Sequence, residues 1–293
     1  MFSVLALSVM TFGCSDDEPN SPRVPTVTEL VVNDPNFSIL ETAVTRAGLA
    51  DYLNNTNPIT VFAPNNAAFA ASGITESVVN ALPVATLDSI LKYHVLSGFV
   101  TSTSVPVSDG VNTVLGTKLF ASRNGNGVFV NGLRVSPADI AANNGVVHVV
   151  EKVLIPPTQT IAAIASSDTS FSFLVAAVAK LGLVPTLSGP GKFTVFAPTN
   201  AAFRAAGITD INAVPVATLE TVVKYHVLNT NVFASDLTNN ASVPTLQGGN
   251  LLVNLSPARV KIASSSATSS NIVAVNITAT NGVIHVIDKV LLP

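Results

Sequence analysis

The sequence predicts an α+β fold made of two tandem copies of one domain. Three ordered motifs occur twice along the chain, each copy begins with helical periodicity, and each continues with alternating runs typical of β-hairpins. Helices that precede the strands, instead of alternating with them, indicate α+β and not α/β. A chain of 293 residues is also long enough for about two domains.

The duplication is visible in three motifs that recur in the same order. They are TVFAPNNAAF at 60–69 and TVFAPTNAAF at 194–203, KYHVL at 92–96 and 224–228, and NGVVHVV at 144–150 and NGVIHVI at 281–287. We expect domains at 26–157 and 158–293. The link at Pro156 and Pro157 is too short and too rich in proline for a long flexible spacer, so we expect the domains to sit against each other at a restricted angle.

Each copy is expected to start with a helix. Apolar residues at helical spacing predict it: Phe37, Leu40, Val44 and Leu49 in the first copy, and Phe171, Leu174, Val175 and Val178 in the second. A short strand at 60–63 then ends at Pro64. Either Asn65 or Asn66 is placed to cap the next helix, as Thr199 or Asn200 is in the second copy.

An amphipathic helix is expected over 84–91, leading into the pair Tyr93 and His94. The remainder of each copy alternates and is rich in Val and Thr, which is typical of strands. Asn-Gly pairs predict hairpin turns at 124–125, 131–132, 144–145 and 281–282.

The four histidines are all expected to be structural rather than catalytic or metal-binding. His94 shares a helix face with Leu87, Ile90 and Leu91, and His226 repeats this with Leu219, Val222 and Val223. Both imidazoles should therefore point into the core and find hydrogen-bond partners there. Tyr93 and Tyr225 face another side of the helix, where we expect partial exposure. His148 and His285 lie in strands that are apolar on both faces and are expected to be core residues.

The residues favour binding over chemistry. Each copy offers two His, no Cys and few acidic residues, whereas a zinc site needs three or four ligands, so we expect no metal and no cofactor. We find no G-x-S-x-G elbow, no Walker spacing and no complete dinucleotide loop. A net charge of −3 excludes a basic nucleic-acid surface. We expect no enzyme and no nucleic-acid partner; an enzyme is the least favoured interpretation.

Residues 1–14 are expected to be a signal peptide and not part of the fold. Their apolar run, 4–10, is far shorter than the roughly 18–20 residues that span a bilayer. Gly13 and Cys14 at its end resemble a bacterial lipobox, which predicts lipidation at Cys14; the alternative is an ordinary signal peptide with an incidental cysteine. Residues 15–25 are acidic and rich in proline and are expected to be a flexible tether.

The three repeated motifs resemble the conserved blocks of the fasciclin (FAS1) domain family. The TVFAP segment is similar to the first block, Tyr-His to the central mark, and NGV(V/I)HV(V/I) to the second block. The resemblance covers nearly all of the chain after residue 25. It implies two domains that are each a β-wedge of mostly antiparallel strands flanked by N-terminal helices. It also implies adhesion through protein or carbohydrate contacts.

The resemblance further implies candidate adhesion residues. By motif these are Tyr93, His94, Tyr225 and His226, together with the pair Asp139 and Ile140. The second copy has Asn276 and Ile277 where the first has that pair, which puts a charge-dependent contact in doubt there. The family's first block often has Asp where Asn66 and Asn200 stand, and either residue can cap a helix.

The leading hypothesis is therefore an exported adhesion module. Its partner would be a cell-surface or matrix protein or a polysaccharide, and it would meet the membrane only through a lipid anchor. We expect it on the outer membrane or cell surface, or alternatively in the periplasm or secreted. The second hypothesis is a ligand-binding or scavenging lipoprotein whose site lies at the domain interface.

Overall fold

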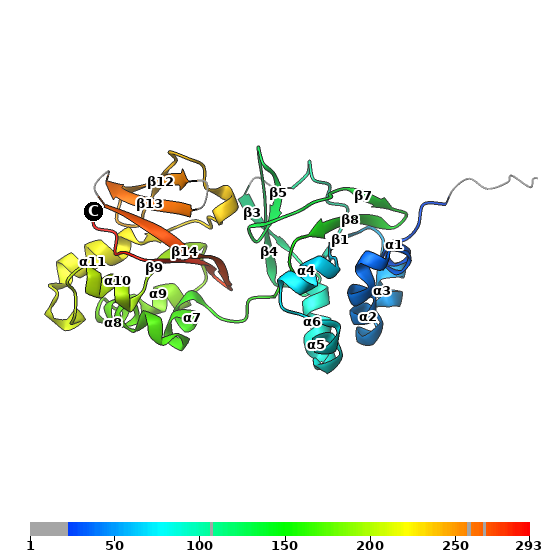
Figure 1. Ribbon diagram of the computed structural model, residues 1–293, viewed down its shortest axis with the longest axis horizontal. Coiled ribbons are helices and arrows are strands. Elements are labelled where there is room, and N and C mark those ends of the chain that lie inside the picture. The colour runs from blue at the N-terminus through cyan, green and yellow to red at the C-terminus, as the bar shows by residue number, and fades with distance from the viewer. Residues whose placement is uncertain (1–22, 106–107, 257–258, 266–267) are drawn as a thin grey trace, which may run out of the picture.

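The computed structural model describes residues 23–105, 108–256, 259–265 and 268–293. The predicted signal peptide, Cys14 and most of the predicted tether lie outside the described residues. Within them the chain forms two similar halves, each with its helices on one side and its strands on the other (Figure 1).

The first half begins with helices, as the periodicity predicts, and ends with strands. Its helices are α1 (Val27–Asn33), η1 (Pro35–Phe37, 3-10), α2 (Ser38–Ala47), α3 (Ala50–Asn55), α4 (Asn66–Ala71), α5 (Glu76–Ala81) and α6 (Val84–Tyr93). Its strands are β1 (Ile59–Pro64), β2 (Val95–Ser97), β3 (Ser108–Asn112), β4 (Lys118–Asn124), β5 (Gly127–Val130), β6 (Leu133–Arg134), β7 (Ile140–Ala142) and β8 (Gly145–Val150).

The second half repeats this order. Its helices are α7 (Ile161–Ser167), η2 (Thr169–Phe171), α8 (Ser172–Lys180), α9 (Val184–Ser188), α10 (Asn200–Ala205), η3 (Ile211–Ala213), α11 (Val216–Tyr225) and η4 (Ala234–Asp236). Its strands are β9 (Phe193–Pro198), β10 (Val227–Leu228), β11 (Ser242–Pro244), β12 (Asn250–Ser256), β13 (Arg259–Ser265), β14 (Thr268–Ala279) and β15 (Gly282–Ile287).

The sheets are mostly antiparallel, as expected. In the first half one sheet has the order β2-β1-β8-β7 and the other β3-β4-β5-β6; in the second half the long strand β14 joins the equivalent strands into one sheet, β10-β9-β15-β14-β13-β12-β11. Among the described strands the parallel pairs are β1 with β8 and β9 with β15. The first and last strands of each half therefore lie side by side inside the sheet, and we call these pairs the central strands.

Each half has two apolar cores. One lies between the helices and the central strands and contains Leu40, Phe69 and Val147 in the first half. The other lies between the central strands and the outer hairpins and contains Phe62 and Leu119. The second half has the same division. Each half is thus a layer of helices, a layer of central strands and a layer of hairpin strands.

The structure shows which of the predicted residues cap the helices α4 and α10. The side chain of Asn65 caps α4 by accepting a hydrogen bond of 2.9 Å from Ala68 N, and Thr199 caps α10 in the same way. Such a cap is typically worth about 1 kcal/mol. Asn66 instead ties α4 to the first helices, because its Oδ1 accepts from Ile39 N at 3.1 Å. Asn200 does the same with Phe173 N at 3.0 Å.

The Asn-Gly pairs mark hairpins, but the turn residues differ from the prediction. Asn131 and Gly132 occupy the two central turn positions between β5 and β6, with φ of 48° and 75°. At the other three hairpins the strand registers move the turn to 125–126, 143–144 and 280–281. At two of them the glycine opens a central strand. A Cβ on Gly145 would lie 2.1 Å from Ile59 O, so close backbone approach explains that glycine.

No single helix among the described residues has the length and apolar composition needed to cross a bilayer; the bent pair Ile161–Ser167 and Thr169–Lys180, at 104°, passes by length and composition only when taken together.

Candidate functional site

The Tyr-His pair stands at the end of α6, where the helix meets strand β2. His94 is 3% exposed, as expected from its helix face. Its Nε2 accepts a hydrogen bond of 2.9 Å from Leu154 N, so Nδ1 carries the proton and donates to Ile90 O at 2.8 Å. Burial lowers the pKa of His94 to about 4. The ring is therefore neutral, fully hydrogen-bonded and unavailable as a general base at neutral pH.

His226 at the end of α11 repeats this arrangement. Its Nδ1 donates to Val222 O at 2.7 Å and its Nε2 accepts from Leu291 N at 2.9 Å. Burial lowers the pKa of His226 to about 4 as well. In both domains the imidazole connects the helix end to the last residues of the domain.

The expectation that Tyr93 and Tyr225 are partly exposed is wrong, because they are 0% and 3% exposed. The helix face that Tyr93 occupies is covered by the outer hairpins, and its hydroxyl donates to Lys118 O at 3.1 Å and accepts from Asn131 Nδ2 at 3.0 Å. Burial raises the pKa of Tyr93 to about 12. Tyr225 donates to Asn250 O at 2.8 Å. Neither tyrosine presents a surface to a partner in this fold.

His148 and His285 lie in the central strands β8 and β15 and are buried, as expected. His148 Nε2 donates to Val100 O at 2.8 Å, and its Nδ1 accepts from Asp139 N at 3.1 Å. The ring also stacks on Phe62, with 5.3 Å between centroids. His285 makes the equivalent contact with Val232 O at 2.8 Å. Each ring thus ties a surface loop to the central sheet.

Asp139 is the exposed member of the predicted set. It has a φ of 58°, and its carboxylate accepts hydrogen bonds from the backbone N–H of Ser102, at 2.8 Å, and from the Ser102 hydroxyl. Burial alone would raise the pKa of Asp139, but these hydrogen bonds outweigh it and the pKa is lowered. The neighbouring Ile140 is half-buried. The first domain therefore presents one fixed negative charge beside an apolar side chain.

Asn276 takes the place of Asp139 in the second domain. It has a φ of 60°, and its Oδ1 accepts from Ala234 N at 2.9 Å. The loop is thus held by the same geometry without the charge. Asn276 is also in contact with Gly132 of the first domain, whose carbonyl oxygen lies 3.5 Å from Asn276 Nδ2.

Further contacts confirm that the domains sit against each other. Ser122 donates to Asp236 Oδ1 at 2.6 Å, and Asn124 Nδ2 donates to Ser235 O at 2.6 Å. An aromatic contact between Phe120 and Phe233, with 5.8 Å between ring centroids, lies at the same junction. Figure 1 shows strands β3, β4 and β5 of the first domain turned toward the second.

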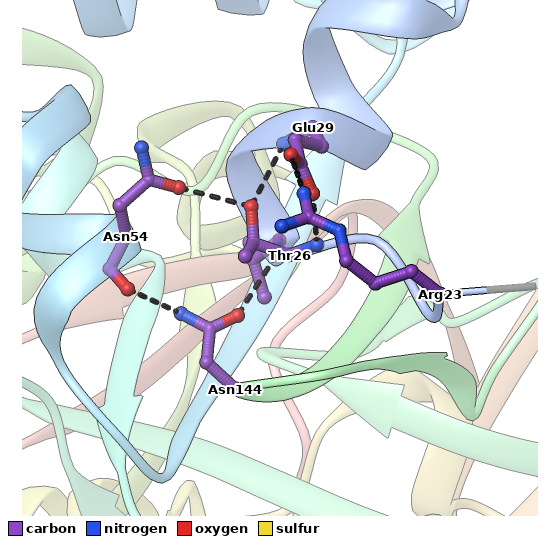
Figure 2. Close-up of polar contacts among 6 residues, drawn as sticks. Arg23, Thr26, Glu29, Asn54 and Asn144 are labelled. Carbon is purple, nitrogen blue, oxygen red and sulfur yellow. Dashed lines mark hydrogen bonds and ion pairs between the residues drawn. The ribbon is translucent and has the colours of Figure 1, made fainter. Parts of the chain in front are cut away.

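Asn144 makes more side-chain hydrogen bonds than the other motif residues described here. The sequence pattern predicts only a turn at this position. Its Oδ1 accepts from Val27 N at 3.0 Å, and its Nδ2 donates to Leu53 O at 2.6 Å. Figure 2 shows it beside Thr26, which donates to Asn54 Oδ1 at 2.9 Å. The side chain joins the start of α1 and the end of α3 to β8.

Arg23 and Glu29 complete the α1 end of this cluster (Figure 2). They form an ion pair, and Glu29 Oε2 accepts from Thr26 N at 2.7 Å. That backbone hydrogen bond is the main cause that lowers the pKa of Glu29. Asn281 repeats the central tie with Ile161 N at 2.9 Å and Leu187 O at 2.8 Å. The signal for this role in the sequence is the identical Asn-Gly pair in both copies.

The described residues include no group of three or more His, Cys, Asp or Glu side chains placed to hold a metal ion. Both ring nitrogens of His94 and of His148 are hydrogen-bonded to backbone groups. The polar residues that recur in both copies hold loops, helices and strands together.

A family model described as Fasciclin domain matches the chain twice, over residues 35–156 and 169–293. The chain belongs to the Fasciclin domain family. The two matched ranges contain all six motif segments, and the predicted boundary after Pro157 falls between them. Each Fasciclin domain here has the helices, central strands and hairpins described above.

Two curated proteins are similar to this pair of Fasciclin domains. Transforming growth factor-beta-induced protein ig-h3 of Sus scrofa is 32% identical over 241 residues, which cover 80% of this chain and 34% of that protein. Protein sll1483 of Synechocystis sp. is 39% identical over 134 residues, covering 45% of this chain and 74% of that protein. The chain spans about a third of the length of the first relative.

A solved structure of a FAS1 domain pair, from the insect cell adhesion molecule fasciclin I, also aligns with the chain. The two share 21% sequence identity and a TM-score of 0.45, over 87% of this chain and 96% of that one.

Proposed function

We propose that this tandem Fasciclin protein is an extracellular adhesion module that binds a cell-surface or matrix protein or a polysaccharide, and that it is not an enzyme. The observation that carries the proposal is that the polar side chains of the motifs are bonded inside their own domains. His94, His148, Asn144 and their second-domain counterparts all make internal hydrogen bonds, so contact with a partner falls to the outer faces. The adhesion role implied by the family resemblance supports the same conclusion.

The surface around Asp139 and Ile140 is the contact we propose for the first domain. Asp139 is exposed and held by Ser102, so its charge has a fixed position. A fixed carboxylate loses little entropy when it accepts hydrogen bonds from a partner. The matching position in the second domain, Asn276, is turned to the domain junction. The two copies therefore divide the roles, with binding in the first and domain contact in the second.

The variant Asp139→Asn tests this contact without disturbing the loop. Asn276 shows that an asparagine with the same φ holds the equivalent loop. We expect binding to a matrix or polysaccharide ligand to weaken about fivefold, the effect of roughly 1 kcal/mol from one lost charge-assisted hydrogen bond. The free energy of unfolding should stay within about 0.5 kcal/mol of the wild-type value.

The ligand itself has to be found first. Purified protein on glycan and matrix-protein arrays would supply it, and a strain lacking the gene should adhere or aggregate less. Asp51→Asn, which removes an exposed charge elsewhere on the first domain, is the matched control. Unchanged adhesion after deletion, or equal loss in both charge variants, would contradict the proposal.

We also propose that the chain is exported and tethered through lipid on Cys14, at the outer membrane or cell surface. The lipobox-like Gly13 and Cys14 and the acidic segment after them support this. Mass spectrometry of the membrane fraction tests it. A mature N-terminus at a residue other than Cys14, or an unmodified one, would favour a periplasmic or secreted protein.

A groove between the domains favours a second candidate function, the binding of a small ligand. It has a volume of about 280 Å³ and is lined by Leu133, Lys152 and Ile155 on one side and by Val275 and Thr278 on the other. The wall also includes Asn131 and Asn276, and a mixed wall of aliphatic and amide groups with the Lys152 ammonium suits a small polar ligand that carries a negative charge. Native mass spectrometry of the purified chain would reveal such a ligand, and Val275→Trp, which fills the groove, should remove it.

A further inference from the structure

The chain contains five Asn-Gly pairs, and their surroundings in the fold differ. They lie at 124–125, 126–127, 131–132, 144–145 and 281–282. In such a pair the glycine nitrogen can attack the asparagine side chain, because glycine has no Cβ that hinders the approach. The reaction needs an amide group that can turn toward the backbone and that water can reach. The burial of each side chain therefore decides which pairs react.

Three of the pairs are protected by burial. Asn131, Asn144 and Asn281 are 5%, 5% and 3% exposed. The amide nitrogen of each also donates a hydrogen bond inside its own domain, at 3.0, 2.6 and 2.8 Å respectively. These side chains cannot turn toward the next backbone nitrogen without losing a buried hydrogen bond.

The other two pairs lie at the hairpin tip between β4 and β5, and their glycines differ. Gly127 begins β5 and pairs with Asn124 in the ladder. Gly125 lies in the turn and is exposed, and none of the described residues accepts a hydrogen bond from its N–H. The Gly125 nitrogen can therefore move toward Cγ of Asn124 without breaking the strand pairing.

The side chain of Asn124 is held in a way that favours this attack. Its Oδ1 accepts a hydrogen bond of 2.8 Å from Asn126 N. This oxygen gains negative charge when a nitrogen adds to Cγ, so a donor that already points at it stabilises the transition state. Asn124 is half-buried, which leaves the tip of the hairpin within reach of water.

The same side chain also holds the junction between the domains. Phe120, Ser122 and Asn124 alternate along β4, so their side chains share one face of the strand. All three meet the second domain, where Asn124 Nδ2 donates to Ser235 O at 2.6 Å. The nitrogen atom that bonds the second domain is the atom that deamidation removes.

We propose that Asn124 is a site of spontaneous deamidation, and that its conversion to aspartate or isoaspartate loosens the junction between the two domains. The Gly125 nitrogen forms a bond to Asn124 Cγ, the bond from Cγ to Nδ2 breaks, and the amide nitrogen leaves as ammonia with the proton of Gly125 N. Water then opens the resulting cyclic imide. Opening at Cγ gives aspartate, and opening at the backbone carbonyl gives isoaspartate. No oxidant or reductant takes part.

Both products oppose the contact with the second domain. The donor to Ser235 O is replaced by a carboxylate, so one acceptor faces another. The new negative charge also lies on the strand face that meets the Asp236 carboxylate, and like charges repel. Isoaspartate in addition lengthens the main chain at the end of β4. The contact between the domains therefore weakens as the molecule ages.

The test follows the purified chain during incubation at physiological temperature and slightly alkaline pH. Trypsin releases residues 124–134 as one peptide, and its fragmentation in the mass spectrometer distinguishes positions 124, 126 and 131. We expect conversion at Asn124 well before conversion at Asn131, Asn144 or Asn281. Distances between spin labels on the two domains should broaden in step with the converted fraction at Asn124.

Three variants separate the reaction from its effect. A Cβ on Gly125 meets no atom within 4 Å, so Gly125→Ala keeps the fold, and it should slow conversion at least about tenfold by hindering the backbone approach. Asn124→Asp carries one of the products and should broaden the distances without incubation. Asn126→Asp places the same charge on an exposed side chain of the same turn and should leave the distances narrow.

Each part of the inference has an outcome that would overturn it. Absence of conversion at Asn124, or conversion at the three buried pairs at an equal rate, would overturn the assignment of the site. A narrow distance distribution in aged, converted protein or in folded Asn124→Asp would overturn the effect on the junction. Because these readouts involve no ligand and no adhesion, they stand apart from the proposed function.

Discussion

The Ser122 hydroxyl of the first domain donates a hydrogen bond of 2.6 Å to the Asp236 carboxylate of the second. The two residues are far apart in sequence and meet only because the domains are in contact. Asp236 also accepts from Phe233 N at 3.0 Å, so the same carboxylate shapes the loop that meets the first domain.

We predict that Ser122→Ala/Asn124→Ala loosens the domain arrangement. Each lost hydrogen bond costs about 1 kcal/mol, and two of them form a large part of a small interface. Distances between spin labels on the two domains should broaden, while each domain keeps its own melting temperature. Arg123→Ala, an exposed neighbour on the same strand, should leave the distance distribution unchanged. A distribution that stays narrow in the double variant would contradict this.

The acid stability of the protein should reflect its buried histidines. His94 and His226 have a pKa of about 4 when folded, below the ordinary value of 6.5, so the unfolded chain binds more protons between these values. The contribution of these imidazoles to the free energy of unfolding is therefore fully present above about pH 6.5 and is lost as the pH falls toward 4. By pH 5 the loss should be about 2 kcal/mol for each histidine. Urea unfolding at pH 7.5, 6 and 5 measures it.

The variant His94→Gln provides the control for this pH dependence. It should reduce the pH dependence of the first domain only. The lowered pKa values of Asp139 and Asp288 add a further loss of stability in the same direction at lower pH. Equal stability at pH 7.5 and 5 would show that the imidazoles are not buried as described.

His94→Ala should destabilise the first domain by about 1–3 kcal/mol. The change leaves Leu154 N and Ile90 O without their buried partner. Thermal unfolding followed by circular dichroism measures the effect. Lys92→Ala, two residues away on a partly exposed ion pair with Asp88, should change stability by no more than about 0.5 kcal/mol. A His94→Ala melt equal to that of the wild type would refute the structural role.

Asn144→Ala should cost about 2–3 kcal/mol, because Val27 N and Leu53 O lose a shared partner in a buried site. Hydrogen exchange at Val27 should speed up as the start of α1 loses its connection to β8. Asn143→Ala changes an exposed neighbour in the same turn and serves as the control. Similar unfolding curves for the two variants would mean that the side-chain tie contributes little.

Gly145→Ala should destabilise the first domain by at least about 2 kcal/mol. The new Cβ would lie 2.1 Å from Ile59 O, so the parallel pair β1 and β8 would have to separate. Gly125→Ala meets no atom within 4 Å and should be within about 0.5 kcal/mol of the wild type. Denaturant midpoints of the two variants compare them directly. A tolerated alanine at 145 would show that the strands can shift.

The duplication made much of the fold predictable. Helical spacing located α2 and α8, and the repeated motifs located the strands and the histidines, because these depend on local pattern. The burial of Tyr93 was missed because periodicity describes one face of α6 against one core. The hairpins that cover its other face are distant in sequence, and a single helix pattern carries no information about them.

The roles of Asn144 and Asn66 were missed for a related reason. An Asn beside Gly, or at a helix start, is locally explained as a turn or a cap, and the sequence pattern predicts only these local roles. Their actual partners, Val27 N and Ile39 N, depend on how the first helices pack on the strands. The domain contacts of Ser122 were likewise beyond reach, since they require the relative position of two domains.

The position of β8 and β15 inside their sheets has a consequence for biosynthesis. Each is the last strand of its domain to be made, yet it pairs with β1 or β9 near that domain's beginning. A growing chain must therefore hold its early strand without a neighbour on that side until nearly the whole domain has been synthesised. The first domain can close while the second is still unfinished, so a chain that stops before Gly282 would carry one complete domain and one without its central strand.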